Sequence, residues 1–167
     1  MTDDVFDLGA YLGRIGYTGP TDPTLTTLAG IVAAHSATIP FENFAALTGE
    51  TPKLDIASLQ AKLVGSKRGG YCYEHSLLLR TALRAMGFEV DGRLGRVIRG
   101  LPFDAPRVLT HMALVVTLPE GSFLADVGFG NSTPTAPLRL EADTEQTTSH
   151  ETFRFAQADK DWVLQIQ

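Results

Sequence analysis

The hydrophobic pattern of this 167-residue chain changes its period once, near Gly87. Before that point apolar residues recur at three- and four-residue spacing, which is the period of a helix with one buried face. After it, short β-branched or aromatic runs are separated by Pro, Gly and Asp clusters, which is typical of antiparallel strands and hairpins. Because helices precede strands without βαβ alternation, the sequence predicts an α+β fold in two parts. These are a helical bundle over residues 1–87 and an antiparallel β-barrel or sheet over residues 88–167.

Three helices are expected in the first part, at residues 22–40, 55–64 and 72–86. Asp22 suits a helix cap and Pro23 the first helical position, so the first helix is expected to begin there and to close at Pro40. The third is expected to end at Gly87, a residue suited to the left-handed turn that finishes helices. The strand-like runs that follow read "FEVDGRLGRVIRG", "THMALVVTLPEGSFLADVGFG" and "HETFRFAQADKDWVLQIQ".

The charge of the chain limits its partners. A net charge of -5 argues against nucleic acid and against an anionic membrane, because those partners need a basic face. Arg93, Arg96 and Arg99 form a local basic cluster, which is either solvated surface or a contact for an anionic ligand. The acidic start "MTDDVFDLGA" differs from a secretory signal, and no apolar run approaches the roughly 18 residues of a membrane span. A cytoplasmic protein is expected.

The only cysteine, Cys72, lies in the stretch "RGGYCYEHS". It cannot form an internal disulfide, so it is a buried small hydrophobe, a metal ligand or a reactive thiol. Gly69 and Gly70 allow a sharp loop, which places Cys72 at or next to the first turn of the following helix. A helix N-terminus and a nearby imidazolium together lower a cysteine pKa from about 8.5 to roughly 3.5–7.5. Free backbone N–H groups at the same point could stabilise an oxyanion.

A nucleophilic thiol needs a base, and the base needs an acceptor that orients it. His35 lies on an apolar helix and His150 in a polar loop, so a structural or solvated role is expected for each. His75 is one turn after the cysteine and would move with the thiol's own backbone. His111 opens the run "THMALVVTL" and Asp126 closes the run "FLADVGFG", so this pair is the candidate base and orienting acid.

His111 and Asp126 point to the same face of an antiparallel hairpin if its loop has an even number of residues. With a turn at Leu118 and Pro119 they are directly opposite. With a turn over residues 119–122, Asp126 is displaced by about four residues, roughly 13 Å, which is too far for a hydrogen bond. The hypothesis therefore demands the first register or a bulge that restores it. The resulting set of parts is that of the cysteine proteases.

Two other interpretations of the thiol stay open at this point. Cys72, His75, His111 and Asp126 could form a zinc site, because thiolate, imidazole and carboxylate are all zinc ligands. Alternatively, the chain is a folding or interaction unit with an inert cysteine, which predicts an ordinary thiol pKa.

Four motifs in order resemble those of the bacterial arylamine N-acetyltransferases. They are "TIPFENF" at 38–44, "RGGYCYEHS" at 68–76, "TH" at 110–111 and "ADVGFG" at 125–130. The resemblance implies a triad of Cys72, His111 and Asp126. It also implies a ping-pong reaction without a metal. The thiolate takes an acetyl group from acetyl-CoA, coenzyme A leaves, and an arylamine or arylhydrazine accepts the group.

The resemblance also implies binding residues. Phe41, Tyr73 and Phe129 occupy positions where the family holds a flat acceptor beside the thiol, although ordinary core packing would also explain aromatic residues there. Gly128 and Gly130 would keep the loop after the aspartate open for the pantetheine arm of coenzyme A.

Three further residues of these motifs are assigned to structure. Arg68 and Glu74 are expected to fix the loop and the helix, as an ion pair or through backbone contacts. Ser76 stands where the family usually has asparagine, which is expected to cost a structural hydrogen bond.

Family members continue past the point where this chain stops, into a linking helical segment and a third α/β lid domain. The expectation is therefore a reactive thiol with little or no transferase activity, in a chain whose C-terminal lid is absent. The uncovered barrel surface would favour self-association. Amide formation or hydrolysis through the same three residues, and a non-catalytic fragment, are the alternatives.

Overall fold

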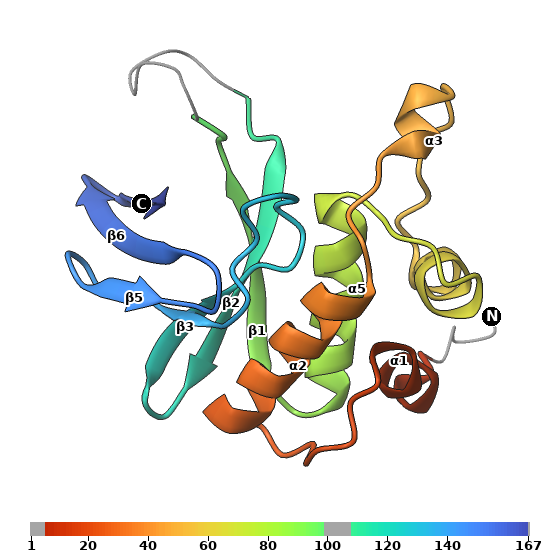
Figure 1. The fold of residues 1–167 in the computed structure, drawn as a ribbon, viewed down its shortest axis with the longest axis horizontal. Helices are drawn as coiled ribbons and strands as arrows, with labels where there is room; N and C mark the ends of the chain where they lie inside the picture. Colours follow the sequence, from red (N-terminus) through yellow and green to blue (C-terminus); the bar gives the residue numbers. More distant parts are fainter. Residues whose placement is uncertain (1–5, 99–107, 167) are drawn as a thin grey trace.

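The computed structural model describes residues 6–98 and 108–166. Within them the helical segments precede the strands (Figure 1). The helices are α1 (Leu8–Ile15), α2 (Leu25–Thr38), α3 (Phe44–Leu47), α4 (Ile56–Leu59), the π-helical segment η1 (Gln60–Gly65) and α5 (Cys72–Ala85). The strands are β1 (Glu89–Gly95), β2 (His111–Leu118), β3 (Gly121–Ala125), β4 (Leu138–Arg139), β5 (Glu145–Thr147), β6 (Thr152–Ala158) and β7 (Asp161–Ile166). The prediction of a mixed fold with antiparallel sheets is confirmed.

The start of α2 follows its capping chemistry. The Thr24 hydroxyl accepts a hydrogen bond from the Thr27 amide at 3.2 Å, so the helix begins at Leu25. The predicted cap at Asp22, with Pro23 as the first helical residue, is wrong, because both residues precede the cap at Thr24.

The other two predicted helices lie close to their expected bounds. Asp55 caps α4 by accepting from the Ser58 amide at 2.9 Å, but the helix widens into η1 at Gln60. α5 begins at Cys72, and Gly87 follows its end with a φ of 86°, in the left-handed region that favours glycine. Helices α1 and α3 were not predicted, since eight and four residues carry little periodicity.

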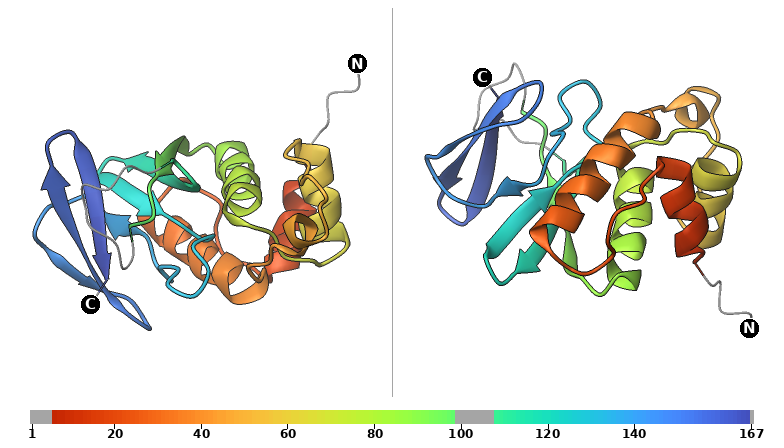
Figure 2. Two further views of the ribbon diagram at one scale, coloured as in Figure 1. Left: turned by 90° about the horizontal axis from the view of Figure 1, so that it is seen from above. Right: turned by 60° about the horizontal axis from the view of Figure 1, so that its bottom comes forward.

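The strands form two antiparallel sheets, with the orders β1-β2-β3-β4 and β5-β6-β7. Leu118 pairs with Gly121, so Pro119 and Glu120 form the turn between β2 and β3. This register lies between the two that the sequence suggested, and neither of them forms. The second sheet lies on the side of the first sheet that is remote from α1 (Figure 2).

One cluster of buried apolar side chains joins the helices to the first sheet. Its fully buried members include Tyr11 on α1, Leu28 on α2, Leu79 on α5 and Leu114 on β2. A smaller cluster joins the two sheets, with Leu138 from β4 of the first and Phe153 and Phe155 from β6 of the second. Burial of such side chains is the main force that holds α5 against β1 and β2.

A buried hydrogen bond adds direction to this packing. The Ser76 hydroxyl on α5 donates to the Met112 carbonyl on β2 at 2.7 Å, and the serine is 1% exposed. The residue that replaces the family's usual asparagine therefore still makes a buried bond between the helix and the sheet.

The basic cluster lies partly within the described residues. Arg93 pairs with Asp91 at 3.4 Å and Arg96 with Asp161 at 3.5 Å, both as exposed pairs of small energetic weight, whereas Arg99 falls outside the described residues. In residues 6–98 and 108–166, no helix has the length and apolar character needed to cross a bilayer.

We predict that Ser76→Ala lowers the free energy of unfolding by about 1–3 kcal/mol, because a buried carbonyl loses its hydroxyl donor. Ser36→Ala on α2 is the matched control, since among the described residues the Ser36 hydroxyl is buried without a hydrogen-bond partner. Urea denaturation of both variants measures the difference. A control variant destabilised as much as Ser76→Ala would contradict the assignment.

Candidate active site

Cys72 is the first residue of α5 and is 8% exposed. Its Sγ lies 3.6 Å from the Thr110 carbonyl oxygen, directly before β2. The start of α5 is held by Glu74, whose carboxylate accepts a hydrogen bond from the Tyr71 amide at 3.0 Å. The thiol therefore lies at the positive end of the helix dipole, as the sequence predicted.

Gly69 and Gly70 serve close packing, and neither has a positive φ. A Cβ on Gly69 would collide with the Pro40 carbonyl, and one on Gly70 would lie 2.9 Å from the Glu74 Cβ. The sharp loop that the glycine pair was expected to allow thus forms without left-handed backbone angles at either residue. Both positions require a residue without a side chain, because the loop packs directly against the 40–42 segment and the first turn of α5.

The candidate base and acid are in contact. His111 Nε2 lies 2.6 Å from Asp126 Oδ2, and the other carboxylate oxygen accepts a hydrogen bond from the Gly128 amide at 3.0 Å. Leu114 pairs with Ala125, so extending the register places Asp126 beside residue 113, diagonal to His111. Diagonal neighbours in a sheet lie within reach of long side chains. The contact therefore needs neither directly opposed residues nor a bulge.

The Cys72 side chain also acts on His111, because it is one of the groups that raise the pKa of the imidazole. Since Nε2 faces Asp126, Nδ1 is the nitrogen left for the thiol. Burial lowers the pKa of His111, but hydrogen bonds and negative charge from Asp126 and Cys72 outweigh it and raise the pKa to about 9. At neutral pH the imidazole is therefore protonated, which is the state that stabilises a neighbouring thiolate.

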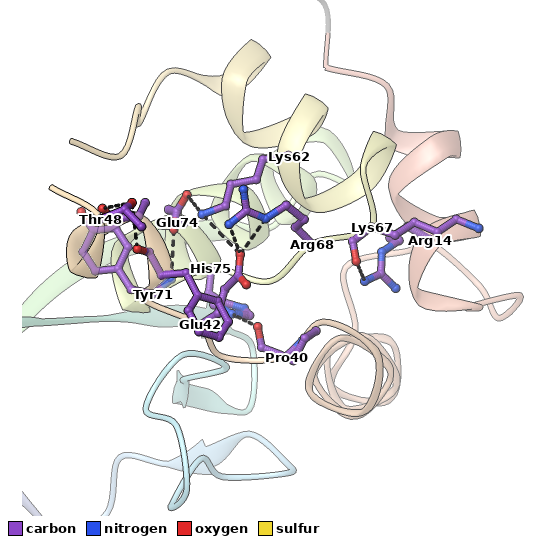
Figure 3. Close-up of polar contacts among 12 residues, drawn as sticks. Arg14, Pro40, Glu42, Thr48, Lys62, Lys67, Arg68, Tyr71, Glu74 and His75 are labelled. Carbon is purple, nitrogen blue, oxygen red and sulfur yellow. Dashed lines mark hydrogen bonds and ion pairs between the residues drawn. The ribbon is translucent and has the colours of Figure 1, made fainter. Parts of the chain in front are cut away.

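A second charged group lies behind the start of α5 (Figure 3). Lys62 Nζ contacts the two carboxylate oxygens of Glu74 at 2.7 and 2.9 Å, and Glu74 is 1% exposed. Glu42 accepts from Arg68 at 2.9 Å and lies 3.8 Å from Lys62. Arg68 and Glu74 therefore pair with Glu42 and Lys62, and Glu74 also makes a backbone contact of the predicted kind, with the Tyr71 amide. Sequence reasoning missed Glu42 and Lys62, although Glu42 stands in the "TIPFENF" motif.

The predicted binding residues are distributed unevenly around the thiol. Phe129 packs edge-on against His111, with ring centroids 5.0 Å apart. Phe41 is 46% exposed, and its ring carbons lie 3.8–4.0 Å from where a Cβ on Gly130 would stand. Tyr73 is half-buried and packs against the main core. Phe129 therefore borders His111, and Phe41 borders the loop that follows Asp126.

The two glycines of the loop after Asp126 differ. A Cβ on Gly128 would lie 2.9 Å from the Cys72 Cα, so its small size lets this loop pack on the first turn of α5. Gly130 has a φ of 85°, which favours glycine. A part for either residue in binding pantetheine stays a prediction.

The remaining histidines lie elsewhere. Both ring nitrogens of His75 are engaged, with His35 Nε2 and with the Pro40 carbonyl. His150 is exposed in a loop. Among the residues that the structure describes, no three His, Cys, Asp or Glu side chains are grouped to hold a metal ion, so the zinc interpretation finds no support there.

A cysteine at a helix start, joined to a histidine and an aspartate from an antiparallel sheet, is the arrangement of the cysteine-nucleophile acyl-transfer enzymes. Within that class the comparisons with known proteins select one family. The N-acetyltransferase family model matches residues 24–167. The chain belongs to the arylamine N-acetyltransferase family, as its motifs indicated.

Relatives and solved structures agree with this membership. An arylamine N-acetyltransferase from Mycolicibacterium smegmatis is 48% identical over 166 residues, which cover 96% of this chain and 60% of the relative. The structure of the Mycobacterium marinum arylamine N-acetyltransferase superposes with a TM-score of 0.92 at 47% identity, over 96% of this chain and 60% of that one. The same enzyme in complex with CoA gives a TM-score of 0.91, at the same identity and coverage. The chain thus spans about 60% of the length of these relatives.

We predict that His111 titrates with a midpoint near pH 9 and that Asp126→Asn lowers this midpoint, because burial then acts with less opposition. The raised pKa also sets the sign of the pH dependence of stability. The stabilisation is complete below about pH 6.5, the ordinary value, and is lost as the pH rises through about 9. NMR titration of the ring protons measures the midpoint, with His150→Ala removing an overlapping signal. An unchanged midpoint in Asp126→Asn would refute the pairing.

Lys62→Met should lower the free energy of unfolding by about 2–4 kcal/mol, because it leaves the buried Glu74 carboxylate without its cation. Arg93→Met, which breaks an exposed pair, should cost less than about 1 kcal/mol. Chemical denaturation compares the two. Adding Glu74→Gln to Lys62→Met should recover part of the loss, and a double variant less stable than the single one would count against this account.

Proposed function

We propose that this chain carries an acetyl group from acetyl-CoA to the nitrogen of an arylamine or arylhydrazine, through an acetyl-cysteine at Cys72. The observation that carries the proposal is the 2.6 Å contact of His111 with Asp126, in a site where the Cys72 side chain also raises the pKa of His111. Family membership and the CoA complex of a relative support the choice of donor.

The first half-reaction begins from the thiolate and the protonated His111. Sγ of Cys72 attacks the thioester carbonyl carbon of acetyl-CoA, and the bond from that carbon to the coenzyme A sulfur breaks. The departing thiolate takes the proton from His111, which becomes neutral. Asp126 keeps the ring in the orientation that aims Nδ1 at the thiol.

The second half-reaction reverses the proton flow. The nitrogen of the acceptor attacks the acetyl carbon, the bond from that carbon to Sγ breaks, and neutral His111 accepts the proton that the nitrogen loses. The enzyme returns to thiolate and imidazolium, so the two halves form a ping-pong cycle.

Phe41, Phe129 and Tyr73 are the side chains that we assign to the flat acceptor. The exposed ring of Phe41 and the edge of Phe129 against His111 support this assignment. Aromatic faces attract planar rings through stacking and edge-to-face contacts. Gly128 and Gly130 are assigned to the pantetheine side of the loop.

The proposal extends to organisation. Residues 1–87 form the part that carries the nucleophile and residues 88–167 the part that carries the histidine and aspartate, in a cysteine-protease-like core. We further propose a cytoplasmic location and self-association through one face of the barrel.

Incubation with acetyl-CoA should add one acetyl group to Cys72, and His111→Ala should slow this step at least about 100-fold, the usual worth of a positioned acid–base group. Intact-mass spectrometry follows the acetyl group, and His150→Ala is the control. The rate of Cys72 alkylation by iodoacetamide at pH 7 should fall in His111→Ala, because the imidazolium that stabilises the thiolate is then removed.

The acceptor step is measured by adding an arylhydrazine to the acetylated chain. Transfer to the hydrazine supports the proposal, whereas loss of the acetyl group at the same rate without acceptor would favour hydrolysis. An unacetylated chain whose alkylation rate is the same with and without His111→Ala would refute a working thiol–histidine pair.

A further inference from the structure

A second hydrogen-bonded chain runs through the core behind the thiol, and the mechanism above does not use it. The Tyr11 hydroxyl on α1 meets His35 Nδ1 on α2 at 2.9 Å, and His35 Nε2 meets His75 Nδ1 on α5 at 2.9 Å. His75 Nε2 then lies 3.3 Å from the Pro40 carbonyl oxygen. All three side chains are 0% exposed.

The carbonyl end fixes the direction of every bond. A carbonyl oxygen can only accept, so His75 Nε2 carries a proton and donates it to Pro40. In neutral His75, Nδ1 is then an acceptor, which requires His35 Nε2 to be the donor. His35 Nδ1 is left as the acceptor for the Tyr11 hydroxyl. The chain therefore has one arrangement of protons, with both histidines in the Nε2–H form.

Burial supports this neutral arrangement. It lowers the pKa of His35 well below its ordinary value, and the charges of His75 and Arg14 lower it further. Burial also lowers the pKa of His75, although the Pro40 and Gly70 backbone and the Glu74 and Asp126 charges act in the opposite direction. The pKa of Tyr11 is raised by burial, so its hydroxyl keeps its proton. With His35 in its Nε2–H form, an additional proton on His75 Nδ1 would place two N–H donors face to face.

The hydrogen-bonded chain of side chains ends at the Pro40 carbonyl (Figure 3), and Phe41 is the next residue in the sequence. The Pro40 carbonyl also accepts from the Gly70 amide at 3.3 Å, and the Glu42 amide donates to the Gly70 carbonyl at 2.8 Å. These two backbone bonds fix Phe41 alongside Gly70, two residues before Cys72. His75 thus holds the carbonyl that precedes the exposed aromatic ring.

We infer that His75, oriented by His35 and Tyr11, is a positioning residue that fixes the Pro40 carbonyl and thereby sets Phe41 beside Gly70, two residues before Cys72. The inference rests on the proposed function, in which Phe41 holds the flat acceptor. Its specific content is a fixed tautomer in the core and an effect on aromatic reagents that leaves the chemistry of the thiol unchanged.

The tautomers are tested in the native chain. Long-range ¹H–¹⁵N NMR of the histidine rings at pH 7, assigned with His35→Gln, His75→Gln and His150→Gln, should show neutral Nε2–H rings for His35 and His75. An Nδ1–H ring or an imidazolium at either position overturns the inference.

The effect on the site is tested with two reagents that share one electrophile, N-phenylmaleimide and N-methylmaleimide. The ratio of their rates at Cys72 reports the aromatic surface, and the methyl reagent alone reports the thiol. Phe41→Ala and His75→Leu should each lower the ratio about three- to tenfold, the usual worth of an aromatic contact. The N-methylmaleimide rate should stay within about twofold.

His75→Gln is the rescue variant, because an amide offers one donor and one acceptor at a spacing close to that of the ring nitrogens. It should restore the native ratio, and His150→Gln should leave it unchanged. Should His75→Leu fail to fold, Tyr11→Phe, which removes only the first donor of the chain, takes its place and should lower the ratio.

The outcomes separate the inference from the proposed function. A native ratio in folded His75→Leu, or a His75→Gln that behaves like His75→Leu, overturns the inference when Phe41→Ala has its effect. A Phe41→Ala with the native ratio shows instead that the acceptor assignment is wrong, and the inference falls with it. A slow N-methylmaleimide rate in the native chain, insensitive to His111→Ala, marks failure of the thiol–histidine pair alone.

Discussion

The close approach of three chain segments at the first turn of α5 is the constraint on which the site depends. The glycine pair lets the loop before the helix run against Pro40, and Gly128 lets the loop after β3 touch the Cys72 backbone. A Cβ at any of these positions would push one segment away, and such crowding is relieved only by moving backbone. The thiol and Asp126 lie 54 residues apart in sequence, and they share one site because the residues at these contacts are glycines without side chains.

Two charged groups flank the helix start and do different work. Lys62 neutralises Glu74, a buried carboxylate that also caps the helix, and so allows an acid to lie near a thiol that, in the proposed function, reacts as a thiolate. The pair of His111 and Asp126 on the other side sets the proton state of the site. The hydrogen-bonded side chains of Tyr11, His35 and His75 lie behind both groups. They orient their neighbours through hydrogen bonds and carry no net charge.

Much of the fold and of the candidate site could be predicted, and the errors have physical causes. The change of period at Gly87 was sufficient for the order of helices and strands, because periodicity reports which face each element buries. The register of β2 and β3 was missed. Both turns that the sequence suggested agree with the alternation of apolar and polar residues, and so does the third turn that actually forms, in which Leu118 pairs with Gly121. The π-helical turn at η1 was missed because its wider spacing leaves no mark in a six-residue stretch.

The sequence alone determined the element types, the position of the one thiol at a helix start and membership of the arylamine N-acetyltransferase family, because these follow from local spacing and short motifs. Tertiary structure decided the partners. Lys62 with Glu74, His35 with His75 and the diagonal contact of His111 with Asp126 join residues 12, 40 and 15 positions apart. Such contacts depend on the register of strands and the rotation of helices about their axes, and a difference of one residue in either turns a side chain to another face.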